Sequence, residues 1–174
     1  MPLTPAVTDL EQLKAYSPVA KLLAWRRDAV VEAKYDRDEL SVTVGAPLIR
    51  SVCAFLKDDP ELGLNFLSDI TCVDWYPAEP RFEVVYHLVS LPAPNTGPVR
   101  GGLRRLRLKV RLEGSEPSLE SITGVWPSAN FPEREVFDLF GIRFEGHPYL
   151  RRIMMPESWD GHPLRKDFPV EGYR

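Results

Sequence analysis

Two Gly-His-Pro triplets near the C-terminus carry the side chains with the greatest capacity for chemistry. They hold His147 and His162 on stiff loops, because proline restricts the preceding residue to extended backbone and glycine permits a sharp turn. Asp160 and Asp167 are close in the sequence, so a metal site or an acid–base pair is one interpretation. The usual HExxH and HxH patterns are missing, which favours structural hydrogen bonds to loop carbonyls or carboxylates. A proton-sensitive contact at an interface is a third interpretation.

A second group of ionisable side chains lies in NFPEREVFDLFG, residues 130–141. Arg134 and Asp138 are four residues apart and are expected to pair on one helix face, and Glu135 lies three residues from Asp138. Two neighbouring carboxylates could do acid–base or metal chemistry. The favoured interpretation is that they bind basic side chains of the following segment. That segment supplies four donors: Arg151, Arg152, Arg165 and Lys166.

Residues 105–112, RLRLKVRL, alternate cations with apolar side chains and so place one kind on each face of a strand. The cations are Arg105, Arg107, Lys109 and Arg111. We favour a solvated sheet face or an edge strand protected from aggregation by its charge. A docking face for an acidic partner is the alternative. Nucleic acid is not expected as a partner, because no aromatic residues are interleaved with the cations and the formal net charge is −3.

The 174 residues are 44% hydrophobic and 27% charged, which is typical of one globular domain. No stretch approaches the roughly 18 to 20 apolar residues of a membrane-spanning helix, and the N-terminus does not resemble a signal peptide, so we expect a cytoplasmic protein. Cys53 and Cys72 are isolated, and we expect buried thiols in place of a disulfide, zinc or iron–sulfur site. The sequence contains no glycine-rich nucleotide-binding motif.

Three helices are predicted in the first third of the chain. Thr8 and Glu11 have the spacing of a capping box at the start of a short helix that reaches residue 16. Ser17 offers an N-cap, with proline next to it, for a helix that ends near residue 27. Pro47 opens a third helix, whose apolar face is predicted to consist of Leu48, Val52, Phe55 and Leu56.

Strands are predicted by alternation of β-branched or aromatic residues with polar ones. Residues 30–34 and 40–44 form an expected hairpin. Residues 66–76, 82–91 and 103–112 follow as three further strands, and a loop rich in proline and glycine at 92–102 joins the last two. This order predicts an α+β fold with a mixed or largely antiparallel sheet and helices packed on one face.

A fourth helix is predicted at residues 131–140. Asn130 is its expected N-cap, Glu133 stands at the capping-box position, and Gly141 is the C-terminal stop. Beyond Gly141 the periodicity disappears, and so long an irregular stretch indicates a function outside the domain. We therefore predict an α+β domain over residues 1–141 and an extended docking segment, not an independent domain, over 142–174.

Several of these segments together resemble one family, the 30 kDa subunit of the proton-pumping NADH:quinone oxidoreductase, respiratory complex I. The most specific matches are EREVFDLFG at 133–141 and GHPLRKD at 161–167. Phe137 and Phe168 stand where family members usually have tyrosine, which removes two phenolic hydroxyls and leaves the charged residues unchanged. The looser matches begin near residue 50 and include FLKDDP at 55–60, FLSDI at 66–70, VDW at 73–75, RFEVVYHL at 81–88 and SIT at 121–123.

The resemblance implies a peripheral-arm subunit on the cytoplasmic face of the cell membrane, in a hetero-oligomer and without a membrane span of its own. The implied partners are the large 49 kDa-type quinone-module subunit and neighbouring iron–sulfur subunits. FMN and the clusters would lie in other subunits, and the complex would use NADH and quinone and translocate protons. This chain is expected to bind no cofactor or metal and to contain no catalytic centre.

On the same resemblance, a charge-assisted lattice would fix the C-terminal segment across a partner, since Arg–carboxylate pairs give an irregular interface its register. Its expected members are Glu133, Arg134, Glu135, Asp138, His147, Arg152, His162, Arg165, Lys166 and Asp167. Two alternatives stay open. One is the equivalent subunit of a membrane-bound energy-converting hydrogenase or of a related quinone oxidoreductase. A more distant one is an independent metal-dependent hydrolase using the two histidines and nearby aspartates.

Overall fold

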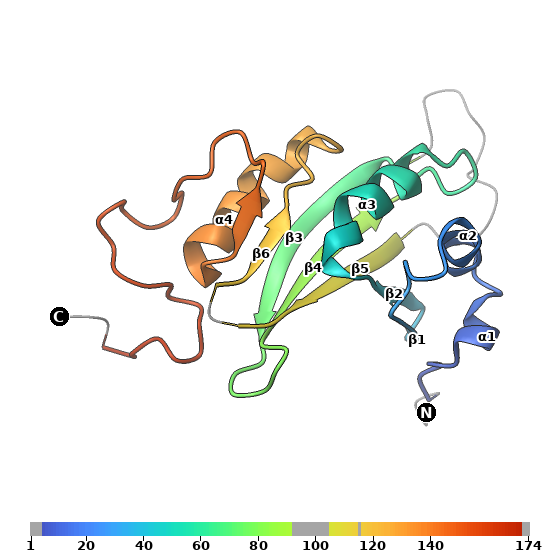
Figure 1. Ribbon diagram of the computed structural model, residues 1–174, viewed down its shortest axis with the longest axis horizontal. Coiled ribbons are helices and arrows are strands. Elements are labelled where there is room, and N and C mark those ends of the chain that lie inside the picture. Colours follow the sequence, from blue (N-terminus) through green and yellow to red (C-terminus); the bar gives the residue numbers. More distant parts are fainter. Residues whose placement is uncertain (1–4, 92–104, 115, 172–174) are drawn as a thin grey trace.

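A five-stranded sheet forms the centre of the protein, for which a computed structural model describes residues 5–91, 105–114 and 116–171. The strands are β1 (Glu32–Asp36), β2 (Glu39–Thr43), β3 (Phe66–Asp74), β4 (Phe82–Val89) and β5 (Arg105–Leu112). Their order in the sheet is β1-β2-β5-β4-β3 (Figure 1). Strand β2 runs parallel to β5, and the other three neighbouring pairs are antiparallel. The predicted α+β fold with a mixed, largely antiparallel sheet is therefore confirmed.

The β1–β2 hairpin forms as expected, because its two-residue turn has the required backbone. Arg37 and Asp38 have φ values of 52° and 63°. A two-residue turn with both residues in the left-handed region matches the twist of the flanking strands. The predicted loop at residues 92–102 lies outside the described residues.

Two helices, α1 (Leu10–Leu13) and α2 (Ser17–Trp25), precede the sheet. Both predicted caps were wrong by one residue. The Asp9 carboxylate, not the Thr8 hydroxyl, accepts the backbone N–H of Glu11 at 2.9 Å. At α2 the N-cap is Tyr16, which has no side-chain bond to the helix, and Ser17 is already helical.

Helix α3 (Ile49–Asp58) follows a 3₁₀ turn, η1 (Ala46–Leu48), and crosses the front of the sheet in Figure 1. Its most buried residues are Ile49, Val52, Cys53 and Leu56. The predicted apolar face was therefore rotated from the observed one. Phe55 lies at its margin because its ring stacks on Trp25 with centroids 4.9 Å apart.

Helix α4 (Asn130–Phe140) lies alongside β3, between two short strands that the sequence did not predict (Figure 1). Strands β6 (Ser118–Glu120) and β7 (Arg143–Glu145) pair in parallel on either side of it in the chain. A 3₁₀ turn, η2 (Pro127–Ala129), leads into the helix. After β7 the described residues form turns and bends, and the chain loops around the outer side of α4 (red in Figure 1).

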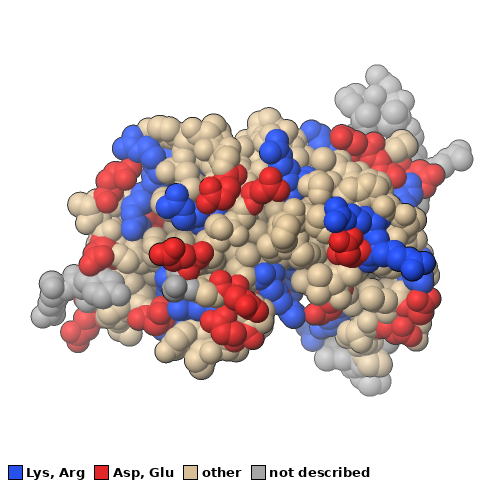
Figure 2. Space-filling view, in the orientation of Figure 1, with Lys and Arg blue, Asp and Glu red and all other residues tan. Residues whose placement is uncertain are grey.

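The core lies between the helices and one face of the sheet. Leu106, Leu108 and Val110 of β5 point into it, while the cations between them point to the opposite face. Both cysteines are free and buried, as predicted, and burial raises the pKa of each thiol. Over the described residues, no helix is long and apolar enough to cross a membrane. Basic and acidic side chains are interspersed on the face in Figure 2.

Candidate docking site

Asp138 is the centre of an ionic cluster that holds the C-terminal segment on α4. Its side chain is fully buried. One carboxylate oxygen accepts a hydrogen bond from Arg152 Nη1 at 2.6 Å, and the other accepts the backbone N–H groups of Ile153, Met154 and Met155 at 2.9, 2.7 and 2.9 Å. Burial alone would raise the pKa of Asp138, but these backbone donors and the guanidinium lower it below its ordinary value. The carboxylate is therefore charged and fully used within the chain.

Arg152 extends this cluster to three parts of the backbone. Its guanidinium also donates to the carbonyl oxygens of Asp138, Trp159 and Gly161, at 3.1, 3.1 and 3.0 Å. One side chain thus joins the last turn of α4 to two points of the irregular segment. The pairing expected between a helix carboxylate and a later basic residue occurs here.

His162 and Arg165 close the C-terminal end of α4. The Asp138 carbonyl accepts a hydrogen bond from His162 Nδ1 at 2.9 Å, and the Phe140 carbonyl accepts one from Arg165 Nε at 2.6 Å. Both bonds satisfy carbonyls that lack partners within the helix. Gly141 is essential to this packing, since its φ is +75° and an added Cβ would lie 2.5 Å from both His162 Nε2 and Arg165 Nη2. The predicted glycine stop is confirmed.

A second cluster ties the end of the segment to β3 and β4. Arg81 binds Asp74 through two hydrogen bonds of 2.9 Å each, and it binds Asp167 through two more of 2.9 and 2.6 Å. The backbone N–H of Lys166 donates to Asp74 Oδ2 at 2.8 Å. Although burial raises the pKa of Asp74, Arg81 and the backbone donors lower it to about 2.

Asp74 and Arg81 were not among the predicted site residues, yet the sequence contained a signal. Asp74 occupies the phase of β3 in which Ile70 and Cys72 are buried. An acidic residue at an apolar position of a strand requires a buried partner. Arg81 begins the next strand across the turn and is the first cation within reach.

Glu133 is buried in a different environment, and the predicted capping box does not form. Asn130 is the first residue of α4 and makes no cap, because the preceding Ala129 already has helical backbone. The Glu133 carboxylate accepts the Ser121 hydroxyl at 2.6 Å and the Ile122 N–H at 2.7 Å. Burial raises the pKa of Glu133 to about 7.

His147 lies at the N-terminal end of α4, away from His162. Its Nδ1 accepts the Tyr149 N–H at 3.0 Å, so the ring is neutral and Nε2 donates to the Asn130 carbonyl at 3.1 Å. Asn130 and Asp138, whose carbonyls bind the two rings, are about 12 Å apart along α4 at 1.5 Å per residue. The two imidazoles therefore do not share a site. Within the described ranges, no group of three or more His, Cys, Asp or Glu residues is placed to hold a metal ion.

The expected pair of Arg134 with Asp138 was wrong. Arg134 instead donates to the carbonyl oxygens of Arg151 and Arg152, at 3.0 and 3.2 Å. Asp138 is on the buried side of α4, where the later backbone reaches it first. Glu135 is exposed and forms no ion pair with any other described residue.

The cationic face of β5 is largely neutralised within the sheet. Lys109 and Arg111 contact Glu83 at 2.7 and 3.3 Å, and Arg107 pairs with Glu39. Strand β5 lies between β2 and β4, so the edge-strand interpretation was wrong. These neighbouring carboxylates leave little unpaired charge to attract an acidic partner.

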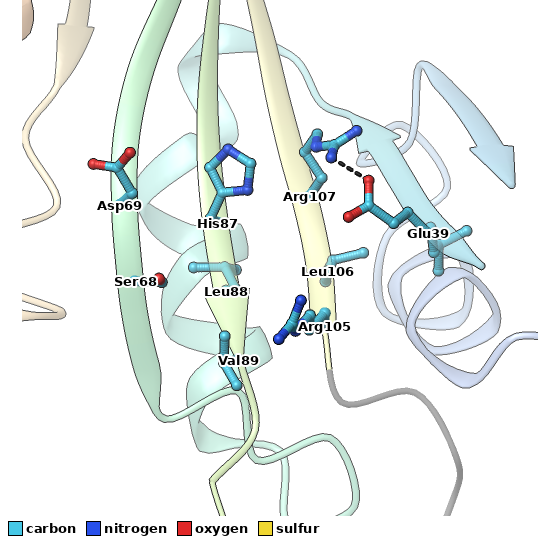
Figure 3. Close-up of a pocket in the computed structure, with 10 residues that line it drawn as sticks. Glu39, Ser68, Asp69, His87, Leu88, Val89, Arg105, Leu106 and Arg107 are labelled. Carbon is cyan, nitrogen blue, oxygen red and sulfur yellow. Dashed lines mark hydrogen bonds and ion pairs between the residues drawn. The ribbon is translucent and has the colours of Figure 1, made fainter. Parts of the chain in front are cut away.

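The same face contains a depression of about 380 Å³. Figure 3 shows that Asp69, His87 and Arg107 line it from β3, β4 and β5, and that Arg107 meets Glu39 of the neighbouring strand. Desolvation and the nearby Arg107 lower the pKa of His87. The arrangement is a mixed polar surface between paired strands.

Large apolar side chains are exposed on α4 and the segment that follows it, in contrast to the internally paired charges. Ile153 and Met154 directly follow the arginine that binds Asp138, and their backbone N–H groups are held by that carboxylate. Such a set on an ordered backbone is typical of a protein-binding surface. The exposed fractions are Phe131 63%, Tyr149 52%, Ile153 38%, Met154 63%, Trp159 39% and Leu164 52%.

The fold and this surface define an α+β subunit of the kind found in multi-subunit respiratory assemblies. A chain from the structure of the membrane-bound sulfane sulfur reductase, an archaeal respiratory membrane complex, matches with a TM-score of 0.65 and 29% identity. The match covers 87% of this chain and 84% of that one. The trypsin-resistant fragment of Nqo5 matches with a TM-score of 0.55 and 41% identity, covering 64% of this chain and 83% of that one.

Residues 42–174 match the family described as "Respiratory-chain NADH dehydrogenase, 30 Kd subunit", and the chain belongs to this family. A relative from Roseiflexus sp. (strain RS-1), named as the C-type subunit of NADH-quinone oxidoreductase, is 48% identical over 163 residues, which cover 94% of this chain and 83% of that protein. The protein of the same name from Geotalea uraniireducens (strain Rf4) is 43% identical, covering 88% of this chain and 87% of that one. The family recognised in the sequence is therefore confirmed.

Proposed function

We propose that this chain is a structural subunit of the peripheral arm of NADH:quinone oxidoreductase, bound at the cytoplasmic face of the membrane. It binds no cofactor itself. It packs against the large quinone-module subunit and neighbouring iron–sulfur subunits, and it supports assembly of the module through which electrons pass from NADH to quinone. FMN and the iron–sulfur clusters belong to the partners, and proton translocation belongs to the whole complex.

The observation that supports this proposal best is the division of labour in the C-terminal segment. Its charged residues bind inward, to backbone groups of α4 and to Asp74 and Arg81. Its large apolar residues, among them Met154 and Leu164, face outward. A partner that covers them would gain about 25 cal/mol for each Å² of apolar surface buried.

The lattice expected from the sequence therefore acts first within the chain. Asp138, Arg152, His162 and Arg165 fix the shape of the segment, and a second group around Asp167 fixes its end. Direct ion pairs between this lattice and a partner stay a prediction. The apolar residues would supply most of the binding free energy, and the lattice would supply their placement.

The test is to replace Met154 with glutamate in the native organism and to compare Glu135→Gln as a control on the exposed side of α4. Met154→Glu places a charge at the interface without touching the inward bonds, so the isolated chain should keep its unfolding midpoint. We expect less assembled complex in the membrane fraction, with NADH:quinone turnover per assembled complex unchanged. Normal assembly with selectively reduced turnover would contradict the proposal.

A second candidate is the equivalent subunit of a respiratory membrane complex that takes electrons from another donor. The specific observation in its favour is the 0.65 TM-score to a chain of the sulfane sulfur reductase complex. The higher identity to the relatives named as subunits of NADH-quinone oxidoreductase favours the first candidate. Identification of the subunits that purify with the native chain distinguishes them, since flavin- and NADH-binding subunits are expected only for the first.

A further inference from the structure

Glu133 is a fully buried carboxyl group that the docking role does not explain. It lies in the first turn of α4, and none of its bonds reaches the C-terminal segment's ionic clusters. Its two donors are the Ser121 hydroxyl at 2.6 Å and the Ile122 N–H at 2.7 Å. A charge at this depth is costly unless a cation accompanies it.

Two hydroxyl groups connect this carboxyl to the surface. Ser121 Oγ is 2.6 Å from Glu133 Oε2 and 2.8 Å from Thr123 Oγ1. Both hydroxyl residues line a depression of about 340 Å³, and exposed Gly124 and Pro127 also border it. The path from the buried oxygen to this depression is therefore two hydrogen bonds long.

The path is satisfied in both directions, because a hydroxyl hydrogen can rotate to suit its partners. With Glu133 ionised, Thr123 donates to Ser121 and Ser121 donates to the carboxylate. With Glu133 protonated, the carboxyl donates to Ser121 Oγ, Ser121 donates to Thr123 Oγ1, and Thr123 turns its hydrogen to the depression. The Ile122 N–H donates to the other carboxyl oxygen in both states.

The groups that face Glu133 do not supply a compensating cation. Cys53 of α3 and Tyr86 of β4 are fully buried, and the pKa of each is raised first by burial and further by the negative charge of Glu133. His147 Nε2 is 3.9 Å from Glu133 Oε2, but its ring is kept neutral by the Tyr149 N–H at Nδ1.

At the outer end of the path, Arg50 and Glu145 line the depression with opposite charges. Neither forms a hydrogen bond or ion pair with Glu133, so the carboxyl group keeps the high pKa that burial imposes, about 7.

We propose that Glu133 is a reversible proton-binding site that exchanges with solvent through the hydroxyls of Ser121 and Thr123. On uptake, an acid of the buffer gives a proton to Thr123 Oγ1, Thr123 passes its own proton to Ser121 Oγ, and Ser121 passes its proton to Glu133 Oε2. Release runs the same steps backward. Each oxygen gains one proton and loses one, apart from the carboxylate, and no electron is transferred.

This site links folding stability to pH with a definite sign. Its folded-state pKa of about 7 is above the ordinary value of 4.5, so the folded chain binds more protons than the unfolded chain between these two values. The stabilisation by the neutral carboxyl is full below pH 4.5 and is lost as the pH rises through about 7.

The test is infrared spectroscopy of the full-length chain in H₂O and D₂O. We expect a protonated-carboxyl C=O band that disappears as the pH rises through about 7 and that is absent in Glu133→Gln. After transfer to D₂O, the band should shift at once in the wild type and in Thr123→Ser. In Thr123→Val, which has the same shape without the hydroxyl, the shift should be slower by about tenfold or more, which corresponds to at least about 1.4 kcal/mol of barrier.

Two results would overturn the proposal. One is a Glu133 carboxyl that titrates at the ordinary value for glutamate. The other is equal exchange rates in Thr123→Val and Thr123→Ser. If Thr123→Val does not fold, the pH dependence of the wild type decides alone: the urea midpoint should fall between pH 5 and pH 7 in the wild type, and this slope should be lost in Glu133→Gln. A slope that persists in Glu133→Gln refutes the site.

Discussion

Replacement of Asp138 by alanine should release the C-terminal segment from α4 without unfolding the sheet. Asp138 has no solvent exposure, and it binds Arg152 and three consecutive backbone N–H groups. Alanine removes all four of these bonds. Water cannot replace them while the segment stays in place, so the segment must open to regain its hydrogen bonds.

The magnitude follows from the kind of bond that is lost. Removal of one partner of a buried ion pair costs about 3–5 kcal/mol. Because the segment can detach from the domain, this cost falls mainly on its local opening and less on global unfolding. Since about 1.4 kcal/mol corresponds to a factor of ten, the open fraction should rise by roughly a hundredfold or more.

Limited trypsin digestion measures this opening, because Arg151, Arg152, Arg165 and Lys166 lie in the segment. The variant should be cleaved there much faster than the wild type, at a nearly unchanged urea midpoint for the core. Glu135→Ala is the matched control on the same helix, since its side chain is exposed, and it should behave as the wild type does. Cleavage of the Asp138 variant within twofold of the wild-type rate would show that this cluster does not hold the segment.

Three further predictions follow from other contacts. Gly141→Ala should destabilise the chain more than Gly146→Ala, because both have positive φ but only the first would place a Cβ within 2.5 Å of other side chains; equal urea midpoints would refute this. Asp74, with a pKa of about 2, contributes about 2 kcal/mol above its ordinary pKa of 3.8 that is lost as the pH falls toward 2; Asp74→Asn should lack this acid dependence in urea titrations, and an unchanged slope would contradict it. Arg165→Ala should lower the amount of assembled complex more than turnover per complex, as measured by native gel activity; the reverse result would count against a docking role.

Most regular elements could be predicted because their signals are local. The β1–β2 hairpin follows from alternation around a polar turn, and Gly141 ends α4 as expected. Strands β6 and β7 were missed because three residues are too few to show alternation. Their pairing joins residues on opposite sides of α4, so it depends on the tertiary fold.

The candidate site could be predicted only in outline. The sequence indicated that acidic residues of α4 would meet basic residues of the later segment, and Asp138 with Arg152 fulfils this. It did not indicate which residues would pair, because spacing within a helix reports only on its surface and Asp138 is buried. Asp74 and Arg81 were missed because their partner Asp167 is distant in the chain, beyond the reach of any local pattern.

The bond of Arg152 to three carbonyl oxygens has a consequence for association. Fixing the backbone of one residue costs about 1–2 kcal/mol of conformational entropy, and a tail that ordered only on contact would meet that cost during binding. In this chain the cost is met during folding, before any neighbour arrives. The protein can therefore join its complex as a nearly rigid body, with its outward methionines and aromatics already in position.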